Sequence, residues 1–254
     1  MRKKVILCCG FSLVLLATGC KSNYGLSDIS RTRILVDSRY DASVDAGAVA
    51  FMQPYKHEVD SIMGPIVGES DHYMVAKQPE SDLSNLLADI MVWGARDYKE
   101  NVDFGVYNMG GIRAALPKGK VTYGDVLEIA PFENKICFFT LSGSTVLQLF
   151  REIAHNGGEG VSKGVELLIT SDGKLKSAKL HGKAIDPNGQ YRVATLDYVA
   201  QGNDRMNAMK AKTNVNSPQD EKSNSRYIII NYFKENAAKG EVVNSVVEGR
   251  IRVE

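Results

Sequence analysis

The densest group of chemically useful side chains lies in residues 107–113, with the sequence Tyr-Asn-Met-Gly-Gly-Ile-Arg. Its two glycines let the backbone turn tightly and come close to a ligand. Asn108 offers an amide that donates and accepts hydrogen bonds, and Arg113 offers a planar fork suited to phosphate or carboxylate. The segment directly follows an apolar run, so an ordinary strand-end turn with a surface arginine is the alternative interpretation.

Two further loops combine an aromatic ring with polar groups. Residues 131–134 place Phe132 beside Asn134, and residues 196–204 couple Tyr198 with a glycine turn and Asp204. A ring can stack on a planar base, while amide and carboxylate groups can bind a base edge and sugar hydroxyls. Each loop alone could equally be a turn beside a strand, but three such loops favour convergence on one ligand.

Other catalytic chemistries find little support in the residue spacing. Metal-dependent hydrolysis needs several histidines and carboxylates at usable spacing, and no His-Glu-x-x-His pattern occurs. The chain has four scattered histidines: His57, His72, His155 and His181. Ser142 and Ser144 lack the Gly-x-Ser-x-Gly elbow of serine hydrolases. We therefore expect no catalytic residue, metal site or cofactor within this chain.

Composition and charge narrow the classes of partner. The 254 residues carry 31 basic and 30 acidic side chains, and 44% of the residues are hydrophobic, which is typical of a globular protein. A near-neutral balance supplies no basic surface for nucleic acid, which we exclude as a partner. Cys137 lies in an apolar run and is expected to be a buried small hydrophobe; a reactive thiol is the alternative.

The N-terminal residues have the pattern of an export signal. Arg2, Lys3 and Lys4 precede a mostly apolar run at 5–16, and Ala-Thr-Gly directly precedes Cys20. This resembles a bacterial lipoprotein signal. It predicts a signal peptide over 1–19, a lipid on Cys20, a tether over 20–33 and an exported protein anchored in the cell envelope, on the periplasmic or surface side. A plain secreted protein or an uncleaved anchor is the alternative.

The remaining residues predict a mixture of helices and strands without regular alternation, and we interpret residues 34–254 as one α+β unit. A long helix kinked at Pro54 is expected over 44–63, and a second helix begins with Ser81 or Asp82 as N-cap. Residues 214–225 look like a linker. The other expected helices cover 144–154 and 226–237, and the expected strands cover 104–107, 136–141, 165–169, 177–180 and 191–194.

Six motifs in order resemble the C-terminal, substrate-binding domain of the 5'-nucleotidase and UDP-sugar hydrolase family. They lie at residues 80–89, 108–113, 119–125, 131–134, 141–143 and 197–204, and residues 247–252 resemble the family's ending. The resemblance covers about 34–254. It implies a four-layer α/β/β/α domain preceded by a long helix that, in full enzymes, links it to a metallophosphatase domain.

The resemblance also implies roles for individual residues. It gives phosphate or active-site contacts to Asn108 and Arg113, and base stacking to Phe132 and Tyr198. It also gives a base hydrogen bond to Asn134 and ribose hydroxyl binding to Asp204. Lys77 stands where the family usually has a phosphate-binding arginine. The usual Gly-Gly-Asp-Gly loop is here Gly-Asn-Asp-Arg at 202–205. Asn203 can take the left-handed conformation, whereas Arg205 can crowd the sugar or add a charge to it.

No segment resembles the Asp-x-His and Gly-Asn-His motifs of the metallophosphatase half. The resemblance therefore implies the nucleotide-recognition half of a 5'-nucleotidase-type phosphohydrolase, which acts in nucleotide catabolism and releases phosphate from nucleoside phosphates. A separately encoded metallophosphatase chain would supply the divalent metal ions, and this chain alone would be inactive. The alternative is a non-enzymatic surface lipoprotein that binds nucleotides or nucleosides.

Overall fold

The computed structural model describes residues 24–41 and 43–254. The predicted signal peptide and Cys20 lie outside the described residues. Residues 24–36 are exposed and have no helix or strand. One compact unit ends at Phe51, and a second spans Met52–Glu254. Within the described ranges, no helix is both long and apolar enough to cross a membrane.

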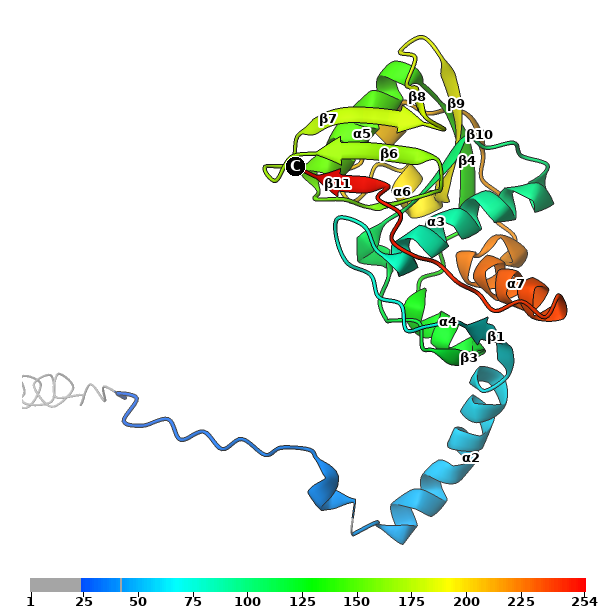
Figure 1. Ribbon diagram of the computed structural model, residues 1–254. Helices are drawn as coiled ribbons and strands as arrows, with labels where there is room; N and C mark the ends of the chain where they lie inside the picture. The colour runs from blue at the N-terminus through cyan, green and yellow to red at the C-terminus, as the bar shows by residue number, and fades with distance from the viewer. Residues whose placement is uncertain (1–23, 42) are drawn as a thin grey trace, which may run out of the picture. The chain divides into compact units, whose positions relative to one another are not determined.

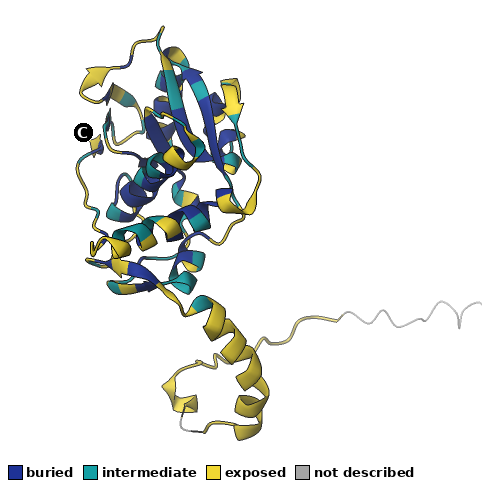
Figure 2. Cartoon of the chain, turned by 90° about the vertical axis from the view of Figure 1, so that its right-hand side faces the viewer, coloured by how far each residue is buried: buried dark blue, intermediate teal, exposed yellow. Residues whose placement is uncertain are grey.

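Helix α2 (Ala46–Met63) is the long helix predicted over 44–63. It runs through Pro54 without interruption. Apart from the half-buried Met63, all of its residues are exposed, as Figure 2 shows by their colour. Its exposed apolar side chains include Val49, Met52 and Ile62. The periodicity therefore predicted a helix correctly, but its apolar side chains do not pack into the core.

A five-stranded sheet forms the centre of the second unit, with the order β10-β4-β9-β2-β5 (Figure 1). Its strands are β2 (Phe104–Tyr107), β4 (Ile136–Ser142), β5 (Gly160–Val161), β9 (Gln190–Leu196) and β10 (Thr213–Asn216). β2 runs parallel to β9, whereas β4 runs antiparallel to β9. The bounds of β2, β4 and β9 agree with the predicted strands to within two residues. These strands were predictable because their apolar side chains are buried and therefore form apolar runs in the sequence.

The remaining strands form two smaller sheets. One has the order β11-β6-β7-β8, and the other pairs β1 with β3. The C-terminal strand β11 runs parallel to β6, so the end of the chain is part of a sheet (Figure 1). Their bounds are β1 (Ile66–Ser70), β3 (Gly119–Thr122), β6 (Val165–Ile169), β7 (Leu175–Leu180), β8 (Lys183–Ala184) and β11 (Ile251–Val253).

Helices cover these sheets and confirm the predicted α+β class. α3 (Asp82–Gly94) packs on β2, β5, β9 and α7 (Ser225–Ala238). α5 (Gly143–His155) contacts β4 and β9 of the five-stranded sheet and β7 of the four-stranded sheet. Ser81 is the N-cap of α3, as predicted, and forms a capping box with Ser84. The shorter helices are α4 (Tyr123–Ile129), α6 (Asp197–Ala200), η1 (Ser38–Tyr40), η2 (Ala95–Tyr98), η3 (Met109–Gly111), η4 (Asn207–Ala211) and η5 (Glu221–Ser223).

Arg250 fastens the C-terminal segment to α3. Its guanidinium, only 5% exposed, donates to both carboxylate oxygens of Asp89 at 2.8 Å and to Glu248 at 2.7 Å. A further bond reaches the carbonyl of Val161 at 2.8 Å. Just before α3, the Glu80 carboxylate accepts the backbone N–H of Ile251. The motifs at 80–89 and 247–252 thus contact each other, and their side chains stabilise the fold.

The prediction of a linker at 214–225 is wrong. Residues 213–216 form β10, which pairs with β4, and residues 221–223 form η5. A polar sequence can form an edge strand because its exposed face needs no apolar side chains. The prediction for Cys137 is confirmed, since this residue is buried in the core.

Candidate functional site

The sheet topology brings the three candidate loops to one edge. The carboxyl ends of β2 and β9 lie at the same edge because these strands are parallel. β4 begins at that edge, since it runs antiparallel to β9 and Ile136 pairs with Leu196. The loop after β2, the loop before β4 and the loop after β9 are therefore neighbours.

These loops enclose a cavity of about 190 Å³. Five of the seven residues predicted to bind the ligand line it, together with two glycines: Asn108, Gly110, Gly111, Phe132, Asn134, Tyr198 and Asp204. They come from segments almost 100 positions apart in the sequence. The convergence expected from three loops beside strands is thus observed.

Asn108 and Asp204 form the polar floor of the cavity. The amide Nδ2 of Asn108 donates to Oδ2 of Asp204 at 2.5 Å, and the Tyr198 hydroxyl donates to Oδ1 at 3.1 Å. The Asp204 carboxylate raises the pKa of Tyr198. Among the described residues, the buried Oδ1 of Asn108 has no hydrogen-bond partner. A Cβ on Gly111 would lie 2.7 Å from this oxygen, so a glycine is needed there.

Phe132 and Tyr198 are the aromatic walls. Phe132 is 46% exposed and Tyr198 is 40% exposed, although large aromatic side chains are usually more buried. The two rings make no contact with each other in the described structure. Two hydrogen bonds between Lys135 and Asp197 join the two loops. The Asp197 N–H donates to the Lys135 carbonyl at 2.8 Å, and the Lys135 N–H donates to Asp197 Oδ1 at 3.1 Å. The rings are thus held at one cavity and remain accessible.

The loop at 202–205 reverses the chain without a left-handed Asn203. Asn203 is not left-handed; instead Asp204 has φ +52° and Arg205 has φ +62°. The side chain of Asn203 donates to the carbonyl of Tyr198 at 2.7 Å. This bond fixes Asn203 to α6, and the reversal of the chain then falls on the next two residues. Two consecutive non-glycine residues in this conformation are strained, which is common where a loop presents a functional side chain.

The two predicted cations, Lys77 and Arg113, are exposed and do not line the cavity. The Arg113 guanidinium reaches the carbonyl of Gly110 at 3.4 Å, next to the cavity wall. Met74 and Leu116 form an antiparallel bridge through two backbone hydrogen bonds of 3.0 and 2.9 Å. Lys77 and Arg113 each lie three residues from this bridge towards its same end, so neighbouring segments carry both cations.

Glu159 is a site residue that the sequence did not reveal. It is 5% exposed, and its Oε2 accepts the N–H of Met109 at 2.6 Å beneath the glycine loop. Burial, and to a smaller extent the Asp204 charge, raises the pKa of Glu159 to about 7. The available signal was a carboxylate directly after Gly-Gly and before a buried strand.

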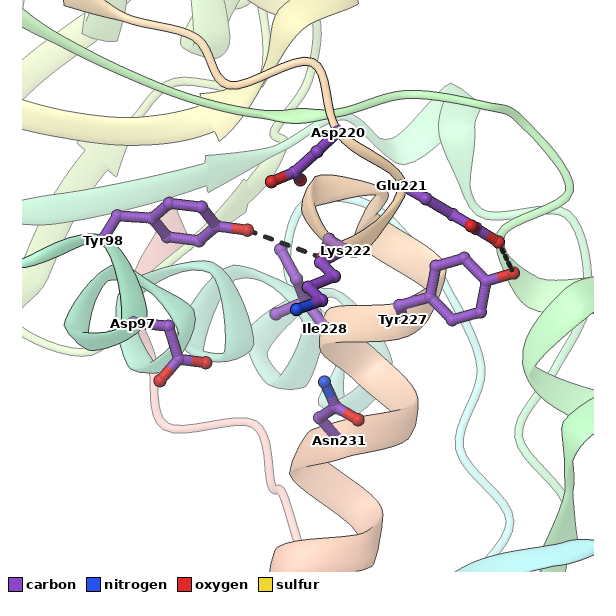
Figure 3. A pocket seen from close by; sticks show the side chains of 8 residues that line it. All are labelled: Asp97, Tyr98, Asp220, Glu221, Lys222, Tyr227, Ile228 and Asn231. Atoms are coloured by element: carbon purple, nitrogen blue, oxygen red, sulfur yellow. Dashed lines mark hydrogen bonds between the residues drawn. The ribbon is translucent and has the colours of Figure 1, made fainter.

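A larger cavity of about 670 Å³ lies between η2 and α7 (Figure 3). Two hydrogen bonds join residues of its lining: the Tyr227 hydroxyl donates to Glu221 at 2.9 Å, and the Tyr98 hydroxyl donates to the carbonyl of Lys222 at 3.5 Å. The Tyr98 hydroxyl also donates to Ser223 at 3.0 Å. In the described part of the chain, no buried side-chain atom lining it lacks a partner. Size alone therefore does not make it the better candidate.

The described residues offer no obvious metal site. Within 24–41 and 43–254, no three or more His, Cys, Asp or Glu side chains are grouped so that they could hold a metal ion. The buried polar groups of the small cavity instead suit a ligand with hydroxyl and amide groups.

The chain thus folds into a domain of mixed α and β structure with a small cavity between two exposed aromatic rings. The sequence model described as "5'-nucleotidase, C-terminal domain" matches residues 66–211, more than half of the chain. The chain belongs to this family. The match includes the loops that carry all seven predicted binding residues.

Relatives agree with this assignment. Protein UshA of Yersinia enterocolitica is 31% identical over 159 residues, which cover 61% of this chain and 28% of the relative. The trifunctional nucleotide phosphoesterase protein YfkN of Bacillus subtilis is 28% identical over 221 residues, covering 79% of this chain and 15% of the relative. The chain thus spans less than a third of either relative.

A solved structure shares the fold. The 5'-nucleotidase precursor of Thermus thermophilus aligns with a TM-score of 0.66 and 25% identity, over 81% of this chain and 42% of that one. The NAD nucleotidase NadN of Haemophilus influenzae aligns with a TM-score of 0.62 and 21% identity, over 83% and 41% of the respective chains. This second likeness concerns the fold alone.

Proposed function

We propose that the cavity binds the nucleoside part of a nucleotide. The observation that carries this proposal is the pair of exposed rings, Phe132 and Tyr198, at one cavity with Asp204 at its floor. The base stacks between the rings, the Asn134 amide bonds to the base edge, and the Asp204 carboxylate accepts hydrogen bonds from ribose hydroxyls. The YfkN and Thermus relatives support a nucleotide ligand by their names.

Lys77 and Arg113 hold the phosphate in this proposal. Both are exposed on segments that pair at the Met74–Leu116 bridge. Arg113 reaches the carbonyl of Gly110 at the cavity wall, where a phosphate attached to the ribose can leave the aromatic slot. Arg113 offers two parallel N–H groups to phosphate oxygens, and Lys77 contributes a point charge. Asn108 stays on the floor of the cavity, where its amide holds the Asp204 carboxylate in place.

The chain then serves as the nucleotide-recognition half of a 5'-nucleotidase-type phosphohydrolase. A metallophosphatase chain supplies the divalent metal ions that activate water and stabilise the leaving phosphate. The exposed apolar side chains of α2, which include Met52, Val59 and Ile62, offer that chain a docking surface. The long relatives, of which this chain spans less than a third, support a role as one part of a larger activity.

A phosphate-release assay tests this division of labour. The full chain is incubated with the monophosphates of adenosine, guanosine, uridine and cytidine, alone and with candidate metallophosphatase chains, with and without a divalent ion. Turnover should require both chains, and Arg113→Ala should lower it. Chelator-sensitive turnover by this chain alone would contradict the split-enzyme proposal.

One observation favours a second candidate, a non-enzymatic nucleoside binder. Among the described residues, Asp204 is the one charged side chain that lines the cavity, and a carboxylate attracts sugar hydroxyls but repels phosphate. Equal affinity for a nucleoside and its monophosphate would favour this candidate. A clear preference for the monophosphate would favour the phosphohydrolase half.

The N-terminal sequence supports a further part of the proposal, an envelope lipoprotein anchored through Cys20. Cys20→Ala should abolish lipid attachment and either release the protein from the membrane fraction or block processing. A variant that remains fully processed and membrane-bound would contradict the anchor.

A further inference from the structure

The turn at residues 156–159, with the sequence Asn-Gly-Gly-Glu, contacts the segment that carries Lys77. The Nε2 of Gln78 donates to the carbonyls of Asn156 at 2.8 Å and Gly158 at 3.0 Å. Gly158 has φ +113°, and a Cβ there would lie 2.2 Å from the carbonyl oxygen of Pro79. Only a glycine permits this approach, so the turn is built to lie directly against the Lys77 segment.

The same turn joins the other two loops. Glu159 accepts the N–H of Met109 through Oε2 at 2.6 Å and the side-chain N–H of Asn156 through Oε1 at 3.2 Å. Asn156 Nδ2 also donates to the carbonyl of Asp204 at 2.8 Å. The glycine loop and the strained Asp204 loop therefore meet on one buried carboxylate and its neighbouring amide.

The hydrogen-bond pattern indicates the charge state that this arrangement needs. Both partners of Glu159, the Met109 amide and the Asn156 side chain, are donors, so both carboxylate oxygens must accept. Protonation would turn one of these two accepting oxygens into a hydroxyl, which is a poorer acceptor, and would weaken the bond made to that oxygen. The ionised form therefore holds both loops more strongly.

We propose that Glu159 is a positioning residue whose ionised carboxylate holds the Met109 loop and, through Asn156, the Asp204 loop in the geometry that binds a nucleoside. Nucleoside affinity then rises with pH as Glu159 loses its proton. This inference rests on the proposed nucleoside site and adds to it a residue that never touches the ligand.

The surroundings of Glu159 cause its carboxyl to lose its proton near neutral pH. The Asp204 carboxylate is the charged group that acts on Glu159 from the neighbouring elements, while the Met109 loop and Asn156 present neutral donors. Burial is the larger cause and Asp204 the smaller cause of a pKa of about 7. A bound nucleoside that shields Asp204 from Glu159 would also favour the ionised form.

The test measures binding of adenosine and uridine to the full chain by calorimetry between about pH 5.5 and 8, a range that spans the pKa of Glu159. Wild-type affinity should rise by about three- to tenfold across this range, the equivalent of one ordinary hydrogen bond. Glu159→Gln, which copies the protonated form with one acceptor and one donor, should keep the low-pH affinity at every pH. Glu241→Gln, at an exposed glutamate that lines no part of the cavity, is the matched control and should retain the wild-type profile.

Asn156→Ala provides an independent variant. It removes the bond to Asp204 but leaves the Met109 bond to Glu159, so it should lower affinity several-fold while a pH dependence remains. Thermal unfolding of each variant shows whether it is folded, and a Glu159→Gln variant that fails to fold would contradict the inference. Wild-type binding with the same pH profile in Glu159→Gln would overturn this inference alone. No nucleoside binding by the wild type at any pH would overturn the proposed function itself.

Discussion

The side-chain amide of Asn108 lies 2.5 Å from the carboxylate of Asp204, although 96 positions separate the two residues in the sequence. This hydrogen bond joins the loop after β2 to the loop after β9. It uses the Nδ2 of Asn108 and leaves the buried Oδ1 without a partner among the described residues. The cavity floor is thus assembled within the chain, which reduces the ordering that binding must impose.

The left-handed conformation of Arg205 predicts an unusual order of stability. Arg205→Gly should be more stable than Arg205→Ala by about 1 kcal/mol, because alanine keeps the strain at φ +62° and glycine does not. At an ordinary exposed position alanine is the more stable. Urea denaturation of both variants measures the difference, and an alanine variant equal to or above the glycine variant would contradict the strain.

Arg250 should matter for stability and not for ligand choice. Arg250→Met leaves Asp89 and Glu248 without their shared cation and should destabilise the fold by about 2–4 kcal/mol, since the guanidinium is buried but both carboxylates are partly exposed. Arg252→Met, at an exposed position in β11, is the control and should change stability by less than about 0.5 kcal/mol. Denaturant midpoints give the comparison; similar values for the two variants would refute the role of Arg250.

Glu159 also predicts how stability depends on pH. Its pKa in the folded protein, about 7, lies above its ordinary value, so the folded state binds this proton more tightly than the unfolded state. This contribution is complete below the unfolded pKa and is lost as pH rises through about 7. Glu159→Gln removes the loss and should be more stable than the wild type at about pH 8, by up to about 3 kcal/mol, with a smaller difference near pH 5. Thermal unfolding at both pH values checks this, and a larger gain at the lower pH would show the sign to be wrong.

Arg113 should distinguish phosphate from base recognition. Arg113→Ala should bind nucleosides almost normally but lose about 1.5–3 kcal/mol of affinity for monophosphates, the usual strength of hydrogen bonds to a charged group. Lys118→Ala, which removes another cation outside the cavity lining, is the control. Calorimetric titration with adenosine and its monophosphate makes the comparison. An equal loss for both ligands would mean that Arg113 supports the loop instead of the phosphate.

Local sequence patterns predicted most of the fold, because apolar burial and helix capping stabilise it and both leave recognisable patterns in the sequence. The buried strand before Asn108 and the Ser81 cap have strong local signals, apolar runs in one case and a capping serine in the other. β10 had no such signal, because its polar residues acquire their structure only by pairing with β4.

Some residues of the candidate site were predictable from the sequence, and others were not. Phe132, Tyr198 and Asp204 were visible as rings and polar groups in loops beside strands, and the sheet then brought those loops together. Glu159 was not, because its importance comes from burial and from contacts with Met109 and Asn156 that no spacing records. The left-handed conformations of Asp204 and Arg205 were not predicted, because the Asn203 side-chain bond to the Tyr198 carbonyl leaves no pattern in the sequence.

The most direct test of the account is a calorimetric titration of the full chain with nucleosides, in the wild type and in variants of the two aromatic walls. Phe132→Ala and Tyr198→Ala should each weaken binding of the preferred nucleoside by roughly five- to a hundredfold, because stacking contributes about 1–3 kcal/mol per base. Tyr73→Ala removes another exposed ring, one that does not line the cavity, and should bind as the wild type does. Unchanged affinity in both wall variants, with the wild type binding nucleosides, would contradict the claim that this cavity is the nucleoside site.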